Sequence, residues 1–225
     1  MLRFASVTRA CVLTATVLVA GTASVARAQT VYSGVQKRFE ITPFGSYQWG
    51  GSFDTDAFAT VPAGELTENS SFSWGAIISF LGSAASAAEL YYLRQDTEVD
   101  FNSNLAGTRT AGDFANNYIQ LGVRQGLPTG GNFLPFITAS LGVNILDPKA
   151  SDLGTSTRFA WSLGGGGLFM AANRRVGVRA DIRWMVTPVP SGTYGGWCDY
   201  WGCFVTEGTA WLHQGQAGLG LVWAF

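Results

Sequence analysis

The sequence predicts an all-β protein: an eight-stranded, antiparallel, up-and-down transmembrane β-barrel. Three observations favour this fold. Of the 225 residues, 47% are apolar and only 13% are charged, so the chain is too apolar to be disordered. Eight segments alternate in side-chain character with the period of two that strands require. The connections between these segments alternate between short and long, as in membrane barrels with short turns on one side and long loops on the other.

The eight alternating segments are 39–49, 72–80, 85–95, 117–127, 133–146, 159–170, 176–187 and 210–225. Each has one apolar face and one face of Glu, Gln, Arg, Ser or Gly, and most have at least the roughly 9–11 residues that a tilted membrane strand needs. The short connections are 81–84, 128–132 and 172–175, which we predict to be periplasmic turns. The long ones are 50–71, 96–116, 147–158 and 188–209, which we predict to be extracellular loops.

The first 28 residues have the three-part layout of a secretory signal peptide. Arg3 and Arg9 precede a short apolar run, and Ala26-Arg27-Ala28 offers small residues at the cleavage positions. A transmembrane anchor is the alternative, but the run is shorter than the ~20 apolar residues that span a bilayer. We therefore predict a cleaved signal peptide at residues 1–28 and a barrel domain at residues 29–225.

Alternation alone does not separate a membrane barrel from a soluble β-sandwich, because the sandwich also alternates. The aromatic residues of the apolar faces separate the two. They fall near two levels of the predicted barrel, where aromatic rings meet lipid headgroups. The outer girdle is predicted to contain Trp49, Trp74, Tyr92, Trp161, Trp184 and Trp211, and the inner girdle Phe39, Phe80, Phe133, Phe169, Trp223 and Phe225.

From residue 39 to its end, the chain resembles the small eight-stranded outer-membrane barrels typified by the membrane domain of OmpA and by OmpX. Its last residues, with Gly220, Trp223 and Phe225, resemble the terminal signal that the barrel-assembly machinery recognises; Gly218 stands where a polar residue is usual. The resemblance implies a location in the outer membrane of a diderm bacterium. It also implies lipid, lipopolysaccharide and the assembly machinery as partners.

Six charged residues are predicted to face the barrel interior: Glu40, Glu89, Arg124, Arg179, Asp181 and Arg183. Three acids balance three arginines, and Glu89 is positioned to pair with Arg124. Because a buried charge is costly unless it is paired, this set predicts a neutral polar plug, as in the OmpA-like barrels. The alternative is a proton or ion pathway, which the balanced charges disfavour.

Cys198 and Cys203 are the only cysteines after residue 28, and they lie in a predicted loop. In an oxidising compartment they predict one disulfide bond. The alternative, a metal site, lacks ligands, since His213 is the only histidine. We predict no metal and no cofactor.

The predicted extracellular loops carry twelve acidic residues against Arg109 and Lys149. Simple solvation explains this excess, and the alternative is a divalent cation held by Asp96, Glu98 and Asp100. Arg94 and Arg158 are predicted at the outer rim, where they would meet lipopolysaccharide phosphates. With a formal net charge of −1, no nucleic-acid partner is expected.

The function predicted from the sequence is structural or surface-interacting, without a catalytic site. A lipid A-modifying enzyme and a narrow channel are the alternatives. Known lipid A deacylases of this kind pair a His with a Ser two residues later, but Gly215 follows His213 at that distance. Four glycines at 164–167 do not form a phosphate loop, since no Lys-Ser/Thr pair and no helix follow; they favour tight coiling of a small barrel.

Overall fold

The computed structural model describes residues 38–55, 64–83, 85–103, 107–127, 129, 131–149, 155–189, 197–199, 202–204 and 210–225. The predicted signal peptide lies outside these residues. Within the described residues, no helix is both long enough and apolar enough to cross a membrane.

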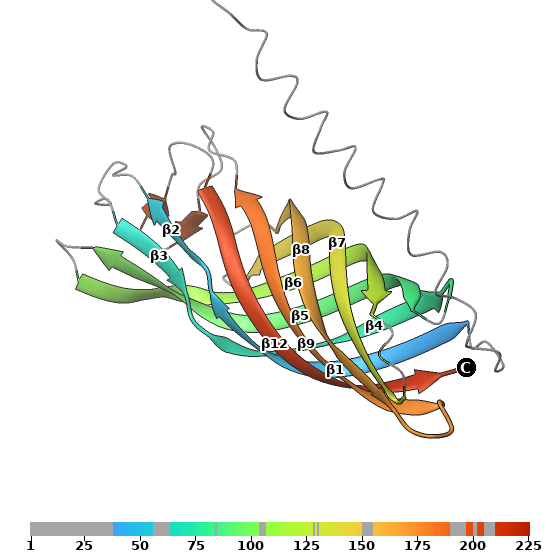
Figure 1. Ribbon diagram of the computed structural model, residues 1–225. Coiled ribbons are helices and arrows are strands. Elements are labelled where there is room, and N and C mark those ends of the chain that lie inside the picture. Colours follow the sequence, from blue (N-terminus) through green and yellow to red (C-terminus); the bar gives the residue numbers. More distant parts are fainter. Residues whose placement is uncertain are drawn as a thin grey trace, which may run out of the picture. The chain divides into compact units, whose positions relative to one another are not determined.

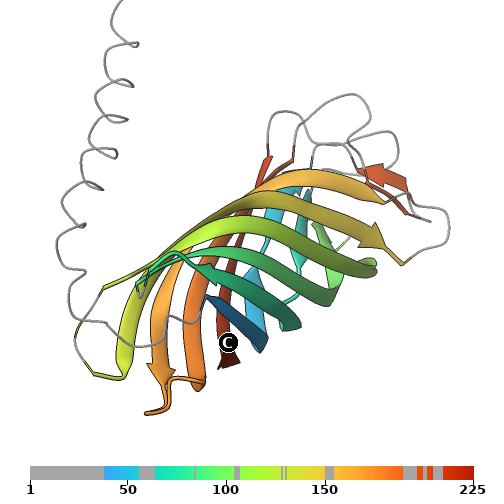
Figure 2. The same cartoon turned by 90° about the vertical axis from the view of Figure 1, so that its right-hand side faces the viewer.

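Eight antiparallel strands close into a barrel (Figures 1 and 2). They are β1 (Phe39–Gly50), β4 (Ser71–Leu81), β5 (Ser86–Ser103), β6 (Gly107–Gly126), β7 (Phe133–Pro148), β8 (Ser156–Met170), β9 (Val176–Val189) and β12 (Ala210–Ala224). The structure therefore confirms the predicted eight-stranded barrel.

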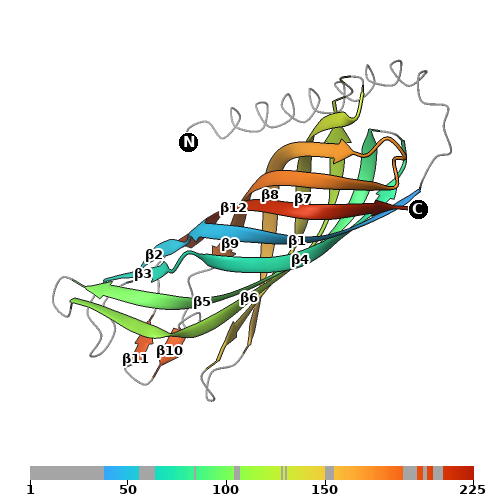
Figure 3. The same ribbon diagram turned by 90° about the horizontal axis from the view of Figure 1, so that it is seen from below.

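The barrel closes by pairing its first strand with its last. Glu40 of β1 lies opposite Ala224 of β12, and Gly50 lies opposite Gln214 at the other end of the same pair. Figure 3 shows β1 between β12 and β4. We call the end with Phe39 and Phe225 the inner end, and the opposite end the outer end.

Four further short strands fall in segments that the sequence predicted to be loops. The hairpin of β2 (Ser52–Thr55) and β3 (Gly64–Glu68) continues the sheet, because β3 pairs with the outer part of β5. The strands β10 (Trp197–Asp199) and β11 (Gly202–Phe204) form a separate pair. The prediction of a loop at 96–116 is wrong for the described residues there, because backbone pairing of β5 with β6 extends to Ser103 and Gly107.

Side chains alternate between the two faces of the barrel wall, as strand geometry requires. On β1 the inward residues Thr42 and Gln48 have no exposed area, whereas Tyr47 and Trp49 are about two-fifths exposed. Large apolar side chains remain exposed on the outer face all around the barrel, including Phe72, Leu121, Ile182 and Leu219. This is the arrangement of a protein whose exterior contacts lipid rather than water.

Candidate functional site

The barrel lumen is the candidate site, because it gathers most of the buried polar side chains. Along β5, the inward residues from the inner to the outer end are Glu89, Tyr91, Leu93 and Gln95, followed beyond Thr97 by Val99 and Phe101, and all are buried. Charged, aromatic, amide and apolar side chains thus follow one another along the barrel axis. The lumen is filled in layers.

The ionic layer contains the six charged residues predicted to face inward. All six are buried, with exposures between 1% and 8%. Arg179 is its centre: its Nη1 and Nη2 donate to the two oxygens of Glu89 at 2.6 and 3.2 Å, and its Nε donates to Asp181 at 3.1 Å. Arg183 contacts the same two acids at 3.4–3.5 Å.

Arg124 has a different principal partner from the one predicted. Its Nη2 donates to Glu40 at 2.8 Å, whereas its Nη1 lies 3.6 Å from Glu89. Among the described residues, Nη1 and Nε of Arg124 have no hydrogen-bond partner. Glu89 is occupied chiefly by Arg179, which reaches it from the opposite wall, a long-range contact that parity along one strand does not reveal.

Glycines make room for the ionic layer at Asp181. A Cβ atom on Gly166 would lie 2.8 Å from the Cα of Asp181, and one on Gly218 would lie 3.3 Å from its Oδ1. These close approaches explain part of the glycine run at 164–167. The same close approach to Asp181 explains why a glycine stands at position 218, where the usual terminal signal has a polar residue.

Apolar layers lie on both sides of the ionic layer. Towards the outer end, Phe44 stacks on Tyr91 with ring centroids 5.4 Å apart, and Ile77, Leu93 and Met185 are fully buried in the same cluster. Towards the inner end, Phe136, Leu168 and Val222 form a second cluster. The guanidinium of Arg183 lies 4.3 Å from the centre of the Tyr91 ring, and that of Arg179 lies 4.6 Å from the Phe136 ring.

A second polar layer, nearer the outer end, consists of amides around one acid. Glu68 of β3 is only 7% exposed and accepts hydrogen bonds from the side-chain amides of Asn116 and Gln214, the latter at 2.7 Å. Both amides also approach Gln95 Oε1, at 3.3 and 3.4 Å. We call Glu68, Gln95, Asn116 and Gln214 the amide layer. No ion pair of Glu68 occurs within the described part of the chain.

Sequence reasoning missed Glu68, which it assigned to a solvated acidic loop. The signal that could have found it is the alternation in Gly-Glu-Leu-Thr-Glu at 64–68, where Leu66 and Glu68 share one face. Leu66 packs with Val99, Phe101 and Phe114 in a buried cluster next to the amide layer. A short strand of five residues carries too little pattern to be separated from a loop.

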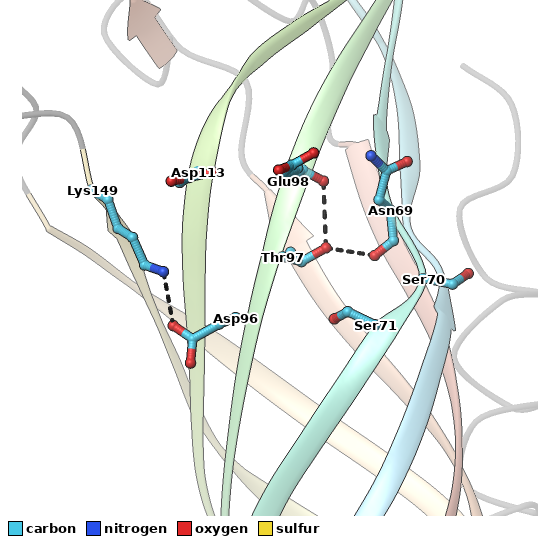
Figure 4. A pocket seen from close by; sticks show the side chains of 8 residues that line it. All are labelled: Asn69, Ser70, Ser71, Asp96, Thr97, Glu98, Asp113 and Lys149. Atoms are coloured by element: carbon cyan, nitrogen blue, oxygen red, sulfur yellow. Dashed lines mark hydrogen bonds and ion pairs between the residues drawn. The ribbon is translucent and has the colours of Figure 1, made fainter.

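An open pocket of about 350 Å³ lies at the outer part of the wall (Figure 4). Asp96 lines it, but this carboxylate is already paired with Arg94 at 3.1 Å and with Lys149 at 3.3 Å. Asp100, outside the pocket, accepts a hydrogen bond from Asn69 at 3.0 Å. Among the described residues, no group of three or more His, Cys, Asp or Glu side chains is arranged to hold a metal ion.

Comparisons with known proteins agree on the fold. No family model and no curated protein sequence matches the chain. Solved structures do match: the Pseudomonas aeruginosa outer membrane protein OprG (14% identity, TM-score 0.57, 84% of this chain and 96% of that one) and AlkL (12%, 0.55, 86% and 93%). Neisserial surface protein A also matches (12%, 0.53, 83% and 97%).

The chain is an eight-stranded barrel of the outer-membrane type. At these identities the likeness establishes the fold and nothing finer. Together with the apolar exterior and the charged interior, this fold places the barrel in an outer membrane, as the sequence predicted.

The predicted aromatic girdles lie on the lipid-facing side of the barrel, and neighbouring members touch. At the outer level Trp74 packs edge-on against Tyr92 and Trp161 against Trp184. At the inner level, ring centroids are 4.4 Å apart for Phe133 and Phe169, 5.4 Å for Phe39 and Phe80, and 6.2 Å for Phe39 and Phe225. Trp49, Trp211 and Trp223 are exposed on the same face.

His213 also faces the lipid. Its ring stacks on Trp184 with centroids 5.5 Å apart. The residue two positions later, Gly215, is packed against the Trp49 indole, which a Cβ atom there would meet at 2.4 Å. Trp184 and Gly215 carry no hydroxyl group that could act as a nucleophile. The position of His213 among aromatic rings therefore fits membership of the aromatic girdle.

Arg158 lies at the outer end of the barrel, as predicted, but its side chain is on the lumen side of the wall. Arg158 lies opposite Asn144, whose buried side chain is in the lumen, and directly opposed residues point to the same face of a sheet. The Arg158 side chain is half-buried and therefore belongs to the outer lumen. Arg94, by contrast, lies opposite Trp74, whose exposed side chain is on the lipid-facing side of the wall.

The assembly signal at the C-terminus and the disulfide bond between the two cysteines stay predictions. Gly220 lies where a Cβ atom would meet Thr42 at 2.8 Å, and Trp223 and Phe225 are exposed on the lipid-facing side. Cys198 and Cys203 are opposite one another in the β10–β11 pair, a position compatible with a disulfide bond, but their side chains lie outside the described part.

Proposed function

We propose that this outer-membrane barrel is a non-enzymatic envelope protein with a closed lumen, which acts through its wall and its extracellular elements. The observation that carries the proposal is the layered filling of the lumen. Charged residues pair with one another in the ionic layer, and buried aromatic and aliphatic side chains lie on both sides of it. An eight-stranded barrel is just wide enough for such side chains, which leaves no continuous water path.

The partners follow from the same surfaces. Lipid acyl chains would cover the apolar belt, and lipopolysaccharide headgroups would meet the rim near Arg94. Gly220, Trp223 and Phe225 would serve as the signal for the barrel-assembly machinery. We also propose that the connections at the inner end are the periplasmic turns and that those at the outer end are extracellular.

Planar-bilayer conductance tests the closed lumen. We expect the unaltered protein to show no steady conductance at neutral pH. Replacing Tyr91, which stacks on Phe44 and donates to Gln216 at 2.7 Å, by glycine should open the central layer and introduce conductance steps. The matched control is Tyr47→Gly, on the lipid-facing side of β1, which should show no conductance steps.

Steady conductance of the unaltered protein, equal to that of Tyr91→Gly, would overturn the closed lumen and favour a channel. Lipid A mass spectra of cells with and without the protein test the enzyme alternative. We expect identical spectra; a new acylation state that depends on His213 would contradict a non-enzymatic role.

A further inference from the structure

Glu68 is a buried acid that the closed lumen does not require. It ends β3, which is not one of the eight spanning strands, and its backbone N–H donates to Gly51 O at 2.7 Å. Its side chain crosses into the lumen to reach Asn116 on β6 and Gln214 on β12. One side chain thereby ties the β2–β3 hairpin to two spanning strands.

Within the described part of the chain, every side-chain hydrogen-bond partner of Glu68 is neutral. Glu68 faces Gln95 of β5, Asn116 and Tyr118 of β6, and Gln214 of β12. The Tyr118 hydroxyl donates a hydrogen bond to the side-chain oxygen of Gln214. Next to it, Leu66, Val99 and Phe101 are apolar. The remaining acids of β5 and β6 nearby, Asp96, Glu98, Asp100 and Asp113, lie on the side of the wall away from the lumen.

Among the side chains that the structure describes, Arg158 is the cation that faces the lumen at this level. It is separated from Glu68 by two amides, because Arg158 lies opposite Asn144, and Asn144 donates to Asn116 at 3.4 Å. Where the structure describes the chain, no ion pair joins Arg158 to Glu68, and the Nε of Arg158 has no hydrogen-bond partner. A buried carboxylate without a counter-charge is costly even where amides donate to it, and such a group lowers the cost by holding a proton.

We propose that Glu68 is a proton-binding group whose neutral carboxyl anchors β3 and its partner β2 to the outer part of the barrel wall, and that loss of the proton releases this strand pair. The proton is the bound ligand, and the amide layer is its site. The proposal is independent of the proposed function, because a closed ionic layer does not require a titrating outer layer.

Burial supports this assignment. Removal from water raises the pKa of Glu68 from 4.5 to about 8, and the hydrogen bond from Asn116 opposes the shift only partly. Opening of the hairpin would return Glu68 to water, where its pKa is ordinary. Between these two values, each pH unit therefore favours the open hairpin by a further factor of about ten.

Hydrogen exchange of the full chain in lipid nanodiscs tests the proposal. The probes are the amides of Glu68 and Asn69, which donate to Gly51 O and Glu98 O. After correction for the intrinsic rate, we expect their protection factors to fall about tenfold per unit between pH 5 and pH 8 and to level off above ~8. In Glu68→Gln, a neutral isostere, protection should be high and independent of pH.

Glu65→Gln is the matched control, because Glu65 is exposed on the same strand, and it should keep the unaltered slope. An infrared carboxylic-acid band near neutral pH that Glu68→Gln removes would support the bound proton without any unfolding step. Flat protection across the pH range, or an unchanged slope in Glu68→Gln, would overturn the proposal. So would protection that rises with pH, as expected if Arg158 paired with an ionised Glu68.

Discussion

The two polar layers of the lumen bury acids in opposite ways. In the ionic layer, Glu89 is 1% exposed and is surrounded by Arg124, Arg179 and Arg183. In the amide layer, Glu68 is 7% exposed and has amide partners. Burial alone therefore does not decide the charge of an acid in this barrel; the counter-charge does.

The comparison shows why one layer suits a permanent plug and the other a switch. In the ionic layer, attraction between oppositely charged partners in a low-dielectric lumen offsets the cost of removing them from water. An acid with only neutral donors keeps its proton until the pH rises far enough. The first layer is held by paired charges, and the second by a bound proton.

Removing the central arginine should give the largest effect. Arg179→Ala leaves Glu89 and Asp181 buried without their main partner, which costs about 3–5 kcal/mol of the free energy of unfolding. Urea titration in lipid vesicles, followed by the gel-mobility difference between heated and unheated samples, measures this loss. Arg175→Ala, in the exposed turn before β9, is the control and should change stability by less than about 0.5 kcal/mol. A loss for Arg179→Ala no greater than for this control would show that the ion pairs contribute nothing.

Neutralising each acid in turn compares the layers directly. Glu89→Gln should destabilise the barrel by about 2–4 kcal/mol near neutral pH, because it replaces the main ionic partner of Arg179 by a neutral amide. Glu68→Gln should be nearly neutral below pH 5, where both forms are uncharged. If Glu68→Gln below pH 5 lost as much stability as Glu89→Gln, the distinction between the two layers would be contradicted.

The pH dependence has a definite sign. The pKa of Glu68 is raised to about 8, so between its ordinary 4.5 and 8 the unfolded chain releases this proton and the folded chain retains it. The free energy of unfolding therefore falls with rising pH, by up to roughly 1.4 kcal/mol per unit, and is constant again above ~8. The difference between Glu68→Gln and the unaltered protein should grow across this window; a difference that shrinks would contradict the assignment.

The sequence predicted the eight strands and the six residues of the ionic layer because each depends on local alternation. Period two assigns Glu89 or Arg183 to the lumen without knowledge of any contact. The partners could not be predicted, since Arg124–Glu40 and Arg179–Glu89 join distant strands and depend on barrel stagger. Glu68 was misplaced, and the lumen side of Arg158 was not predicted, for a related reason: strand pairing extends into segments whose polar sequence resembles a loop.

The smallest effect is expected at the outer end of the wall, where an ion pair of the same chemistry is exposed. Arg94 donates from Nε and Nη2 to both oxygens of Asp96 at 3.2 and 3.1 Å, with the two side chains 36% and 43% exposed. Solvent screens such a pair, so Arg94→Ala should cost at most about 1 kcal/mol and lose that cost in high salt. The cost of Arg179→Ala should not change with salt, because mobile ions do not reach the ionic layer. A salt-independent loss at Arg94 as large as that at Arg179 would mean that geometry, and not the depth of burial, sets the strength of ion pairs in this barrel.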